Sequence, residues 1–367
     1  MKHAPLLALT LAACGGAPAP APPPVASPPA SSPPSAAVSA APTPAAAPAP
    51  VRFVATPIPL PGATGPVSLD YLARDRAAGR VWIPAGDTGS VDVLDVATGK
   101  LTRIEGFQTA VRDAHGTKHV TGPSSVTLGE GVAYVGNRAT SQICAVDLAQ
   151  LTRGACVTLA SAPDGLQYVA ATKELWATTP EDKSLTILDA ATPAKLTPKT
   201  KIALPGEPEG YAVDEGRGIF YTNLEDGDKT LAIDVKAHRV TATWDSKCGE
   251  KGPRGLALDA ARGFLFVACT DQVEVLDAGH GGGLLSKLAT GEGVDNIDYL
   301  EARGQVYAAA GKAGALTVAH VDDKGILTLV ATAPTAPGTR VVVVGREGTA
   351  YVADGKQGRV LAMAPAP

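Results

Sequence analysis

Short stretches in which apolar and polar residues alternate recur from Arg52 to the end of the chain. Ser90–Val96 and Gln272–Asp277 are typical of them, and Gly-containing turns such as Ala97–Lys100 separate one stretch from the next. A period of two residues predicts β-strands, and the turns predict that these strands are joined as hairpins. Beyond Arg52 the sequence has no capped run with the 3.6-residue period of a helix, so the pattern predicts an all-β domain.

These strands are grouped in a unit of roughly 45 residues that occurs seven times. Its clearest copies, Pro208–Tyr221 and Pro253–Phe266, each read Pro-x-Gly, a short apolar strand, Asp, a Gly turn and a second strand. Four short strands fill such a length, which is the period of a propeller blade. We therefore predict a seven-bladed β-propeller. Its blades open near Pro66, Pro123, Pro163, Pro208, Pro253, Val294 and Pro337.

The two ends of the repeat region indicate how such a ring would close. The last repeat has only three strands, at Arg340–Val344, Thr349–Ala353 and Arg359–Met363. At the other end, Arg52–Gly62 resembles Leu327–Gly338, which contains the outer strand of the sixth repeat. We expect the N-terminal strand to complete the seventh blade, because this removes an open sheet edge that would invite aggregation.

The repeats resemble those of the YVTN, or YncE-like, seven-bladed β-propellers of bacterial cell envelopes. The resemblance covers residues 52–367. It implies the fold but no particular activity, since propellers host lactonases, dehydrogenases, peptidase gates and plain binding surfaces. The chain departs from the repeat pattern in one place. The first two repeats open 57 residues apart, which indicates an insertion around Gly106–Thr121.

The N-terminus has the pattern of an export signal. A basic start precedes an apolar run, Leu6–Ala13, that is too short to span a bilayer as a permanent helix. The run ends in Leu-Ala-Ala-Cys, which resembles the lipobox of bacterial lipoproteins. This resemblance implies that Cys14 is acylated and that residues 1–13 are removed, with an ordinary secreted protein as the alternative. Because Gly15 rather than Asp follows the cysteine, the sorting rule of enteric bacteria favours the outer membrane.

Residues 14–51 form a segment of a different composition. Between Ala17 and Pro50, 13 of the 34 residues are proline and nearly all others are Ala or Ser, without a charge. Such a segment cannot bury a core and is expected to stay extended and solvated. At about 3.1 Å per residue in the polyproline conformation, this linker would let the propeller, residues 52–367, stand up to roughly 100 Å from a membrane.

Four cysteines remain besides Cys14, which is an even number in an oxidising compartment. Cys144 and Cys156 fall in the third and fourth strands of blade two, on either side of a hairpin turn. Cys248 lies in the connection that leads into blade five, and Cys269 ends the second strand of that blade. We predict the bridges Cys144–Cys156 and Cys248–Cys269, with buried free thiols as the alternative. No Cys-x-x-Cys or Cys/His spacing indicates a metal site here.

Composition and motifs exclude several classes of function. The net charge is −4 and the basic residues are scattered, so we expect no nucleic-acid partner. The signatures of serine hydrolases, zinc peptidases, phosphate-binding loops, dinucleotide sites and haem attachment are absent, and we predict no cofactor. Asp226–Asp228 and Asp322–Asp323 lack the further oxygen ligands that calcium needs, and Gly279–Gly283 lacks a following helix to hold a phosphate. All three are expected to be turns.

One candidate site lies at the mouth of the predicted central channel. In a propeller, the entry to each inner strand and the connections between blades lie on one face around the axis. The residues that follow the repeat openings, and those that end the second strands, should therefore surround the mouth. In chain order they are Ser124, Asn137, Arg138, Asp164, Glu209, Asn223, Arg254, Asp295, Arg340 and Asp354.

This ring of charged and amide side chains allows two interpretations. It can be a satisfied polar network that caps a wet channel. It can also be a pocket for a small polar or anionic ligand, with Arg138, Arg254 and Arg340 as the contacts to an anion.

A second candidate is the insertion between blades one and two. It holds Asp113, His115 and His119, and imidazole and carboxylate groups suit a transition metal. A spacing of four residues aligns ligands on a helix, however, whereas this segment contains Gly116 and has no helical pattern. An exposed loop near the channel is the alternative.

The sequence thus favours an envelope-anchored lipoprotein whose propeller binds a protein partner, as a scaffold, or a small polar ligand. The alternative is a hydrolase similar to propeller lactonases, in which Asp164, Glu209 and Asp295 would act as general base or hold a metal. Arginine and aspartate side chains paired with each other would favour a scaffold. Carboxylates that converge on one point would favour an enzyme.

Overall fold

A computed structural model describes residues 19–21, 23, 51–114 and 117–366 of the chain. The predicted signal peptide, Cys14 and nearly all of the linker lie outside these described residues, as does His115 of the insertion. Within the described residues, no helix is both long enough and apolar enough to cross a lipid bilayer.

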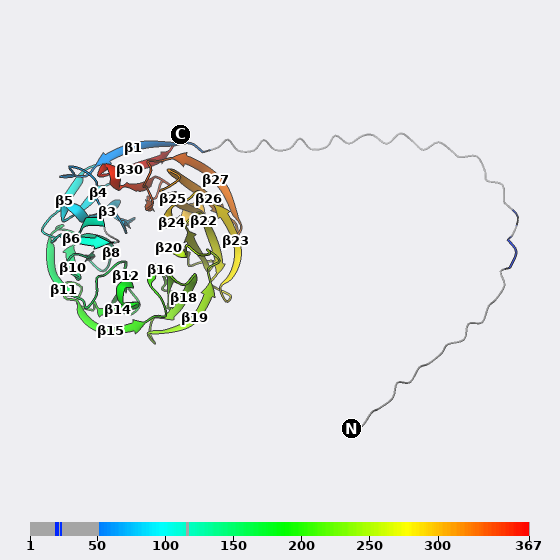
Figure 1. Cartoon of the computed structure of the whole chain (residues 1–367), viewed down its shortest axis with the longest axis horizontal. Coiled ribbons are helices and arrows are strands. Elements are labelled where there is room, and N and C mark those ends of the chain that lie inside the picture. The colour runs from blue at the N-terminus through cyan, green and yellow to red at the C-terminus, as the bar shows by residue number, and fades with distance from the viewer. Residues whose placement is uncertain (1–18, 22, 24–50, 115–116, 367) are drawn as a thin grey trace, which may run out of the picture. The chain divides into compact units, whose positions relative to one another are not determined.

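Seven four-stranded antiparallel sheets surround a central axis, as the repeat predicts (Figure 1). In each blade the first strand lies nearest the axis, and the fourth lies at the rim. From the axis outward, blades one to three are β2 (Ala73–Asp75), β3 (Arg80–Ala85), β4 (Ser90–Asp95) and β5 (Leu101–Ile104); β8 (Pro123–Leu128), β9 (Val132–Asn137), β10 (Gln142–Asp147) and β11 (Arg153–Thr158); and β12 (Leu166–Val169), β13 (Glu174–Thr179), β14 (Ser184–Asp189) and β15 (Thr197–Ala203).

The remaining blades repeat this order. Blades four to six are β16 (Pro208–Asp214), β17 (Ile219–Leu224), β18 (Lys229–Asp234) and β19 (Arg239–Asp245); β20 (Pro253–Asp259), β21 (Phe264–Cys269), β22 (Gln272–Asp277) and β23 (Gly283–Ala289); and β24 (Val294–Leu300), β25 (Gln305–Ala310), β26 (Ala315–Val321) and β27 (Leu327–Pro334). Blade seven is β28 (Val342–Val344), β29 (Ala350–Asp354), β30 (Arg359–Pro365) and β1 (Phe53–Pro59). Outside the blades lie a hairpin, β6 (Ala110–Ala114) and β7 (Thr117–Thr121), and the short 3-10 helices η1 (Gly86–Thr88), η2 (Pro180–Asp182), η3 (Glu301–Arg303) and η4 (Gly355–Gln357).

The ring closes through the N-terminal strand. β1 runs antiparallel to β30, with Phe53 opposite Pro365 and Pro59 opposite Arg359. β1 is therefore the fourth strand of blade seven, which confirms the closure expected from the sequence. Each end of the propeller sequence thus contributes strands to one sheet, and no blade is left open.

The hydrophobic core lies between the blades. Seven clusters of buried apolar residues can be distinguished in the described residues, and each joins two neighbouring blades. Trp176 of blade three stacks on Phe220 of blade four, with ring centroids 4.7 Å apart. The second strands β9, β13 and β21 are buried at every residue because both of their faces pack against other blades. The outer strand β19 instead alternates between exposed and partly buried residues.

The Pro-x-Gly motif has a structural reason. A Cβ atom on Gly210 would overlap the carbonyl oxygen of Arg254 on the next inner strand, and one on Gly255 would overlap Asn296. Inner strands converge toward the axis, so only glycine permits so close an approach. The pairing between β16 and β17 also shifts its register between Pro208 and Tyr211, as a bulge does. The motif therefore sets the start of the inner strands β16 and β20, which is where the candidate site lies.

Candidate functional site

The residues predicted from the strand openings come together at one end of the central channel. Glu209, Arg254 and Asp295 are the second residues of β16, β20 and β24, and Asp164 and Arg340 precede β12 and β28. Since all inner strands begin on the same face, these side chains share one mouth. Their charges are close enough to perturb one another's pKa values, as described below.

Arg138 organises one half of the mouth. Its guanidinium forms ion pairs with Asp70, at 2.9 Å, and with Asp164. The hydroxyl of Tyr71 donates to Asp164 and lies equally close to Glu209, at 3.3 Å from each carboxylate. The ring of Tyr71 also contacts that of Tyr211, with centroids 5.5 Å apart. Residues of four blades are thereby joined in one polar network.

Glu209 differs from the other carboxylates of the mouth. Among the described residues it forms no ion pair with an arginine or lysine. Burial, together with the charges of Asp295 and Asp70, raises the pKa of Glu209 to about 8. This side chain is therefore mostly protonated at neutral pH, and it can donate a hydrogen bond as well as accept one. Burial also raises the pKa of Asp295, although Arg340 opposes that shift.

The other half of the mouth consists of separate arginine–carboxylate pairs. Arg254 lies 2.5 Å from Glu225, and Arg340 lies 2.8 Å from Asp295. The side chain of Arg340 remains 53% exposed, so it keeps donors free for a ligand. Asp70, Asp164, Glu225 and Asp295 are thus each paired with an arginine, whereas Glu209 is not.

A pocket of about 780 Å³ opens beside these pairs. This volume falls within the range of small-molecule sites. Blades four to seven and their connections form its wall, which carries charges of both signs. Its charged residues are Glu207, Glu225, Asp226, Glu250, Lys251, Arg254, Glu292, Asp295, Lys312, Arg340 and Lys356. We call it the mouth pocket.

The predicted residues that end the second strands do not line the mouth pocket. Asn137, Asn223 and Asp354 are almost completely buried. Asn137 donates to the carbonyl of Gln108 at 2.9 Å, Asn223 donates to the carbonyl of Arg254 at 2.6 Å, and Asp354 accepts from Arg359 at 2.7 Å. Asn137 and Asn223 thus bind backbone outside their own blades, whereas Asp354 binds within blade seven. Ser124 is buried as well, and its hydroxyl has no hydrogen-bond partner in the described residues.

Sequence reasoning missed Asp70 and Tyr71, which supply blade one's part of the mouth. The blade-one opening predicted at Pro66 lies too far from the inner strand β2. A better signal was available in the turn that follows each inner strand. Asp70 lies nine residues before Gly79, as Glu209 lies before Gly218 and Asp295 before Gly304. The backbone φ of each of these glycines is positive, so the turn fixes the phase of the blade.

The insertion between blades one and two is a β-hairpin rather than an irregular exposed loop. β6 and β7 pair with Asp113 opposite Lys118 and His119 opposite Arg112. His119 lines a pocket of about 280 Å³ that also contains Arg340 and Lys356 of the mouth. Because His115 lies outside the described residues, the metal-binding hypothesis for Asp113, His115 and His119 stays a prediction.

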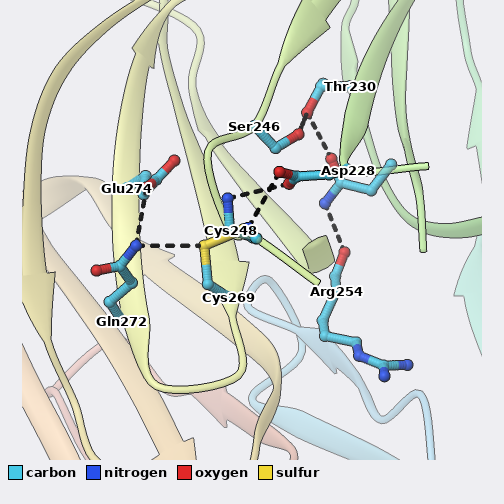
Figure 2. The surroundings of a disulfide bond; sticks show 10 residues. Asp228, Thr230, Ser246, Cys248, Arg254, Cys269, Gln272 and Glu274 are labelled. Atoms are coloured by element: carbon cyan, nitrogen blue, oxygen red, sulfur yellow. Dashed lines mark hydrogen bonds between the residues drawn. A yellow bond between two sulfur atoms is a disulfide. The ribbon is translucent and has the colours of Figure 1, made fainter. Parts of the chain in front are cut away.

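Both predicted disulfides are present. Cys144 of β10 and Cys156 of β11 are bonded across their hairpin, with Cα atoms 3.9 Å apart. Cys248, in the connection after β19, is bonded to Cys269 at the end of β21 (Figure 2). Glu250 of the mouth pocket lies in the same connection as Cys248, and the second bridge fixes this connection to blade five.

Comparisons with known proteins bear on the fold alone. The sequence matches no protein-family model and no curated protein. A chain of a structure titled mitotic checkpoint complex is 14% identical with a TM-score of 0.68, over 90% of this chain and 98% of that one. A streptogramin B lyase is 10% identical with a TM-score of 0.66, over 86% and 98%. Virginiamycin B lyase from Staphylococcus aureus is 13% identical with a TM-score of 0.64, over 86% and 100%. At such identities these similarities show the propeller fold and no function.

Proposed function

We propose that this chain is an exported lipoprotein of the YncE-like propeller group and that its mouth pocket binds a small polar ligand with charges of both signs. Acylated Cys14 would anchor it to a bacterial membrane, with the outer membrane favoured. Residues 15–51 would tether the propeller to that anchor. The proposal for export rests on the lipobox-like N-terminus and the Ala/Pro-rich linker.

The mouth pocket carries the proposal for binding. Its volume of about 780 Å³ suits a small molecule, and charged side chains dominate its wall. Arg340 is half exposed beside Asp295 and can turn donors toward a carboxylate or phosphate. Lys356 and Glu250 form no ion pair with another described residue, so each offers an uncompensated charge to the pocket. A zwitterion such as an amino acid or a short peptide would pair its carboxylate with Lys356 and its ammonium group with Glu250.

Pairing of most mouth carboxylates with arginines favours a scaffold or binding role over hydrolysis. Asp164, Asp295 and Glu225 each have an arginine partner. Within the described residues, no three mouth carboxylates bring oxygen atoms close enough together to share a metal ion. The chemistry that the geometry supports directly is electrostatic recognition of a polar ligand.

A titration of the purified protein with zwitterionic amino acids, dipeptides, dicarboxylates and diamines tests this proposal. We expect a ligand of the first two classes to raise the melting temperature and to give a dissociation constant by calorimetry. Arg340→Ala should weaken that binding at least about tenfold, as loss of a charged contact does. Arg262→Ala is the matched control, since Arg262 pairs with Asp259 at 2.7 Å at the opposite end of the inner strand β20. Equal losses in both variants, or binding of none of these compounds, would refute a mouth site.

A hydrolase remains the second candidate because of Glu209. Its raised pKa makes it a proton donor at neutral pH, with Tyr71 positioned at 3.3 Å. Lactones and esters should then be cleaved by the protein, and Glu209→Gln should abolish turnover while the melting temperature stays unchanged. Turnover that survives this substitution would exclude Glu209 as the acid. If neither ligands nor substrates are found, cross-linking in the envelope would test the scaffold role with a protein partner.

A further inference from the structure

A buried glutamate, Glu274, lies beside the Cys248–Cys269 disulfide, although a purely structural cross-link does not need a carboxylate there. A carboxylate oxygen of Glu274, on β22, and the two sulfur atoms all lie within 4.8 Å of one another. Figure 2 shows Glu274 and Gln272 on one side of the bridge and Asp228 on the other. Among the described residues, no other three Cys, His, Asp or Glu side chains meet this spacing.

Glu274 is poorly satisfied where it lies. Its side chain is completely buried, and its Oε1 accepts a hydrogen bond from Gln272 at 2.9 Å. Its Oε2 has no hydrogen-bond partner in the described part of the chain. A buried carboxyl with an unused oxygen is costly, and a bound cation would satisfy that oxygen.

The two cysteines are held in place independently of their covalent bond. The carboxylate of Asp228 accepts hydrogen bonds from the backbone N–H groups of Cys248 and Gly249, at 3.0 Å each. Cys269 is fixed in the sheet, opposite Pro253. Both side chains should therefore still face each other, and Glu274, after the bridge is reduced.

We propose that the reduced protein binds one zinc ion through Cys248, Cys269 and Glu274. A dithiol would transfer two electrons and two protons to the bridge, which yields two protein thiols and the disulfide of the reductant. The zinc ion would then displace the protons of both thiols and of the carboxyl group, and water would complete four-coordination. Thiolate and carboxylate are both zinc ligands.

Zinc binding to the reduced protein tests the proposal. Cys14, Cys144 and Cys156 are first replaced by serine, so that the reduced chain carries only the two thiols of the site. A water-soluble phosphine serves as reductant because dithiols chelate zinc. Zinc is titrated in competition with a chromophoric chelator, and cobalt replaces it to reveal thiolate-to-metal charge-transfer absorption.

We expect one zinc ion per reduced chain, none on the oxidised chain, and a thiolate band with cobalt. Glu274→Gln should weaken zinc binding by at least about tenfold, in the range found for groups that support a metal site. Asp92→Asn is the matched control, because Asp92 is a completely buried carboxyl at the equivalent position of the third strand of blade one, with no described cysteine bridge of this kind beside it. This control should leave the zinc affinity unchanged.

Circular dichroism of the reduced protein before zinc is added separates binding from folding. If reduction unfolds the propeller, zinc should restore the folded spectrum, and Glu274→Gln should lose this rescue. Absence of zinc binding would overturn the proposal, as would equal affinity in the parent, the Cys248→Ser variant and the Glu274→Gln variant. The result does not depend on the ligand of the mouth pocket.

Discussion

Asp92 should make the propeller less stable as the pH rises from 4 to 6. Its side chain, on β4, is 0% exposed, and neither of its oxygens has a hydrogen-bond partner among the described residues. Burial raises the pKa of Asp92 to about 6, although Arg103 on the neighbouring strand opposes the shift. An aspartate in the unfolded chain has a pKa of about 3.9.

The sign of the effect follows from these two pKa values. Well below pH 4 the carboxyl is protonated in both states, so its ionisation makes no difference to the free energy of unfolding. As the pH rises, the unfolded chain loses its proton first. The free energy of unfolding therefore falls until the pH passes the folded pKa of about 6. A difference of roughly two pKa units corresponds to a loss of about 3 kcal/mol at pH 8 and about half of that at pH 5.

The substitution Asp92→Asn keeps the shape of the side chain and removes the charge. We expect it to increase the free energy of unfolding by about 3 kcal/mol at pH 8, by about 1.5 kcal/mol at pH 5, and by little at pH 4. Urea unfolding followed by tryptophan fluorescence, without reductant, measures this difference, since Trp82 packs in the neighbouring strand.

Asp95→Asn in the same strand is the control. Hydrogen bonds from Thr98 lower the pKa of Asp95, so its substitution should destabilise the protein above pH 4 instead. A stabilisation by Asp92→Asn that is the same at pH 5 and pH 8 would refute the argument from ionisation, as would no stabilisation at pH 8.

Three further changes test the closure, the cross-links and the anchor. Deletion of Phe53–Pro59 removes the strand whose seven residues pair with β30 and, at about 1 kcal/mol for each lost ladder hydrogen bond, should cost several kcal/mol. A lower melting temperature and aggregation on a sizing column are expected, and a stable monomer would contradict the closure. Replacement of both Cys144 and Cys156 by serine opens a loop with a sequence separation of 12 and should cost about 3 kcal/mol by calorimetry, whereas an unchanged melting temperature would contradict it. Cys14→Ser should abolish incorporation of a labelled fatty acid and release the protein from the membrane fraction, and retention of the label would exclude this cysteine as the anchor.

The sequence alone determined the blades, their number and the way the ring closes. Alternation along the strands and glycine at many of the turns act over a few residues, so they can be read directly. The resemblance of Arg52–Gly62 to Leu327–Gly338 then identified the closing strand. The two disulfides could also be predicted, because the blade phase places Cys144 beside Cys156 and Cys248 near Cys269.

Only the tertiary structure decided which charges meet. Arg138 of blade two pairs with Asp70 of blade one and Asp164 of blade three, and no spacing in the sequence encodes that triangle. The raised pKa of Glu209 likewise depends on burial and on carboxylates that reach it from other blades. Strand patterns arise within a blade, where neighbours in sequence are neighbours in space. Ion pairing and desolvation at the mouth act across the axis of the ring, where residues far apart in the chain become neighbours only after the ring has closed.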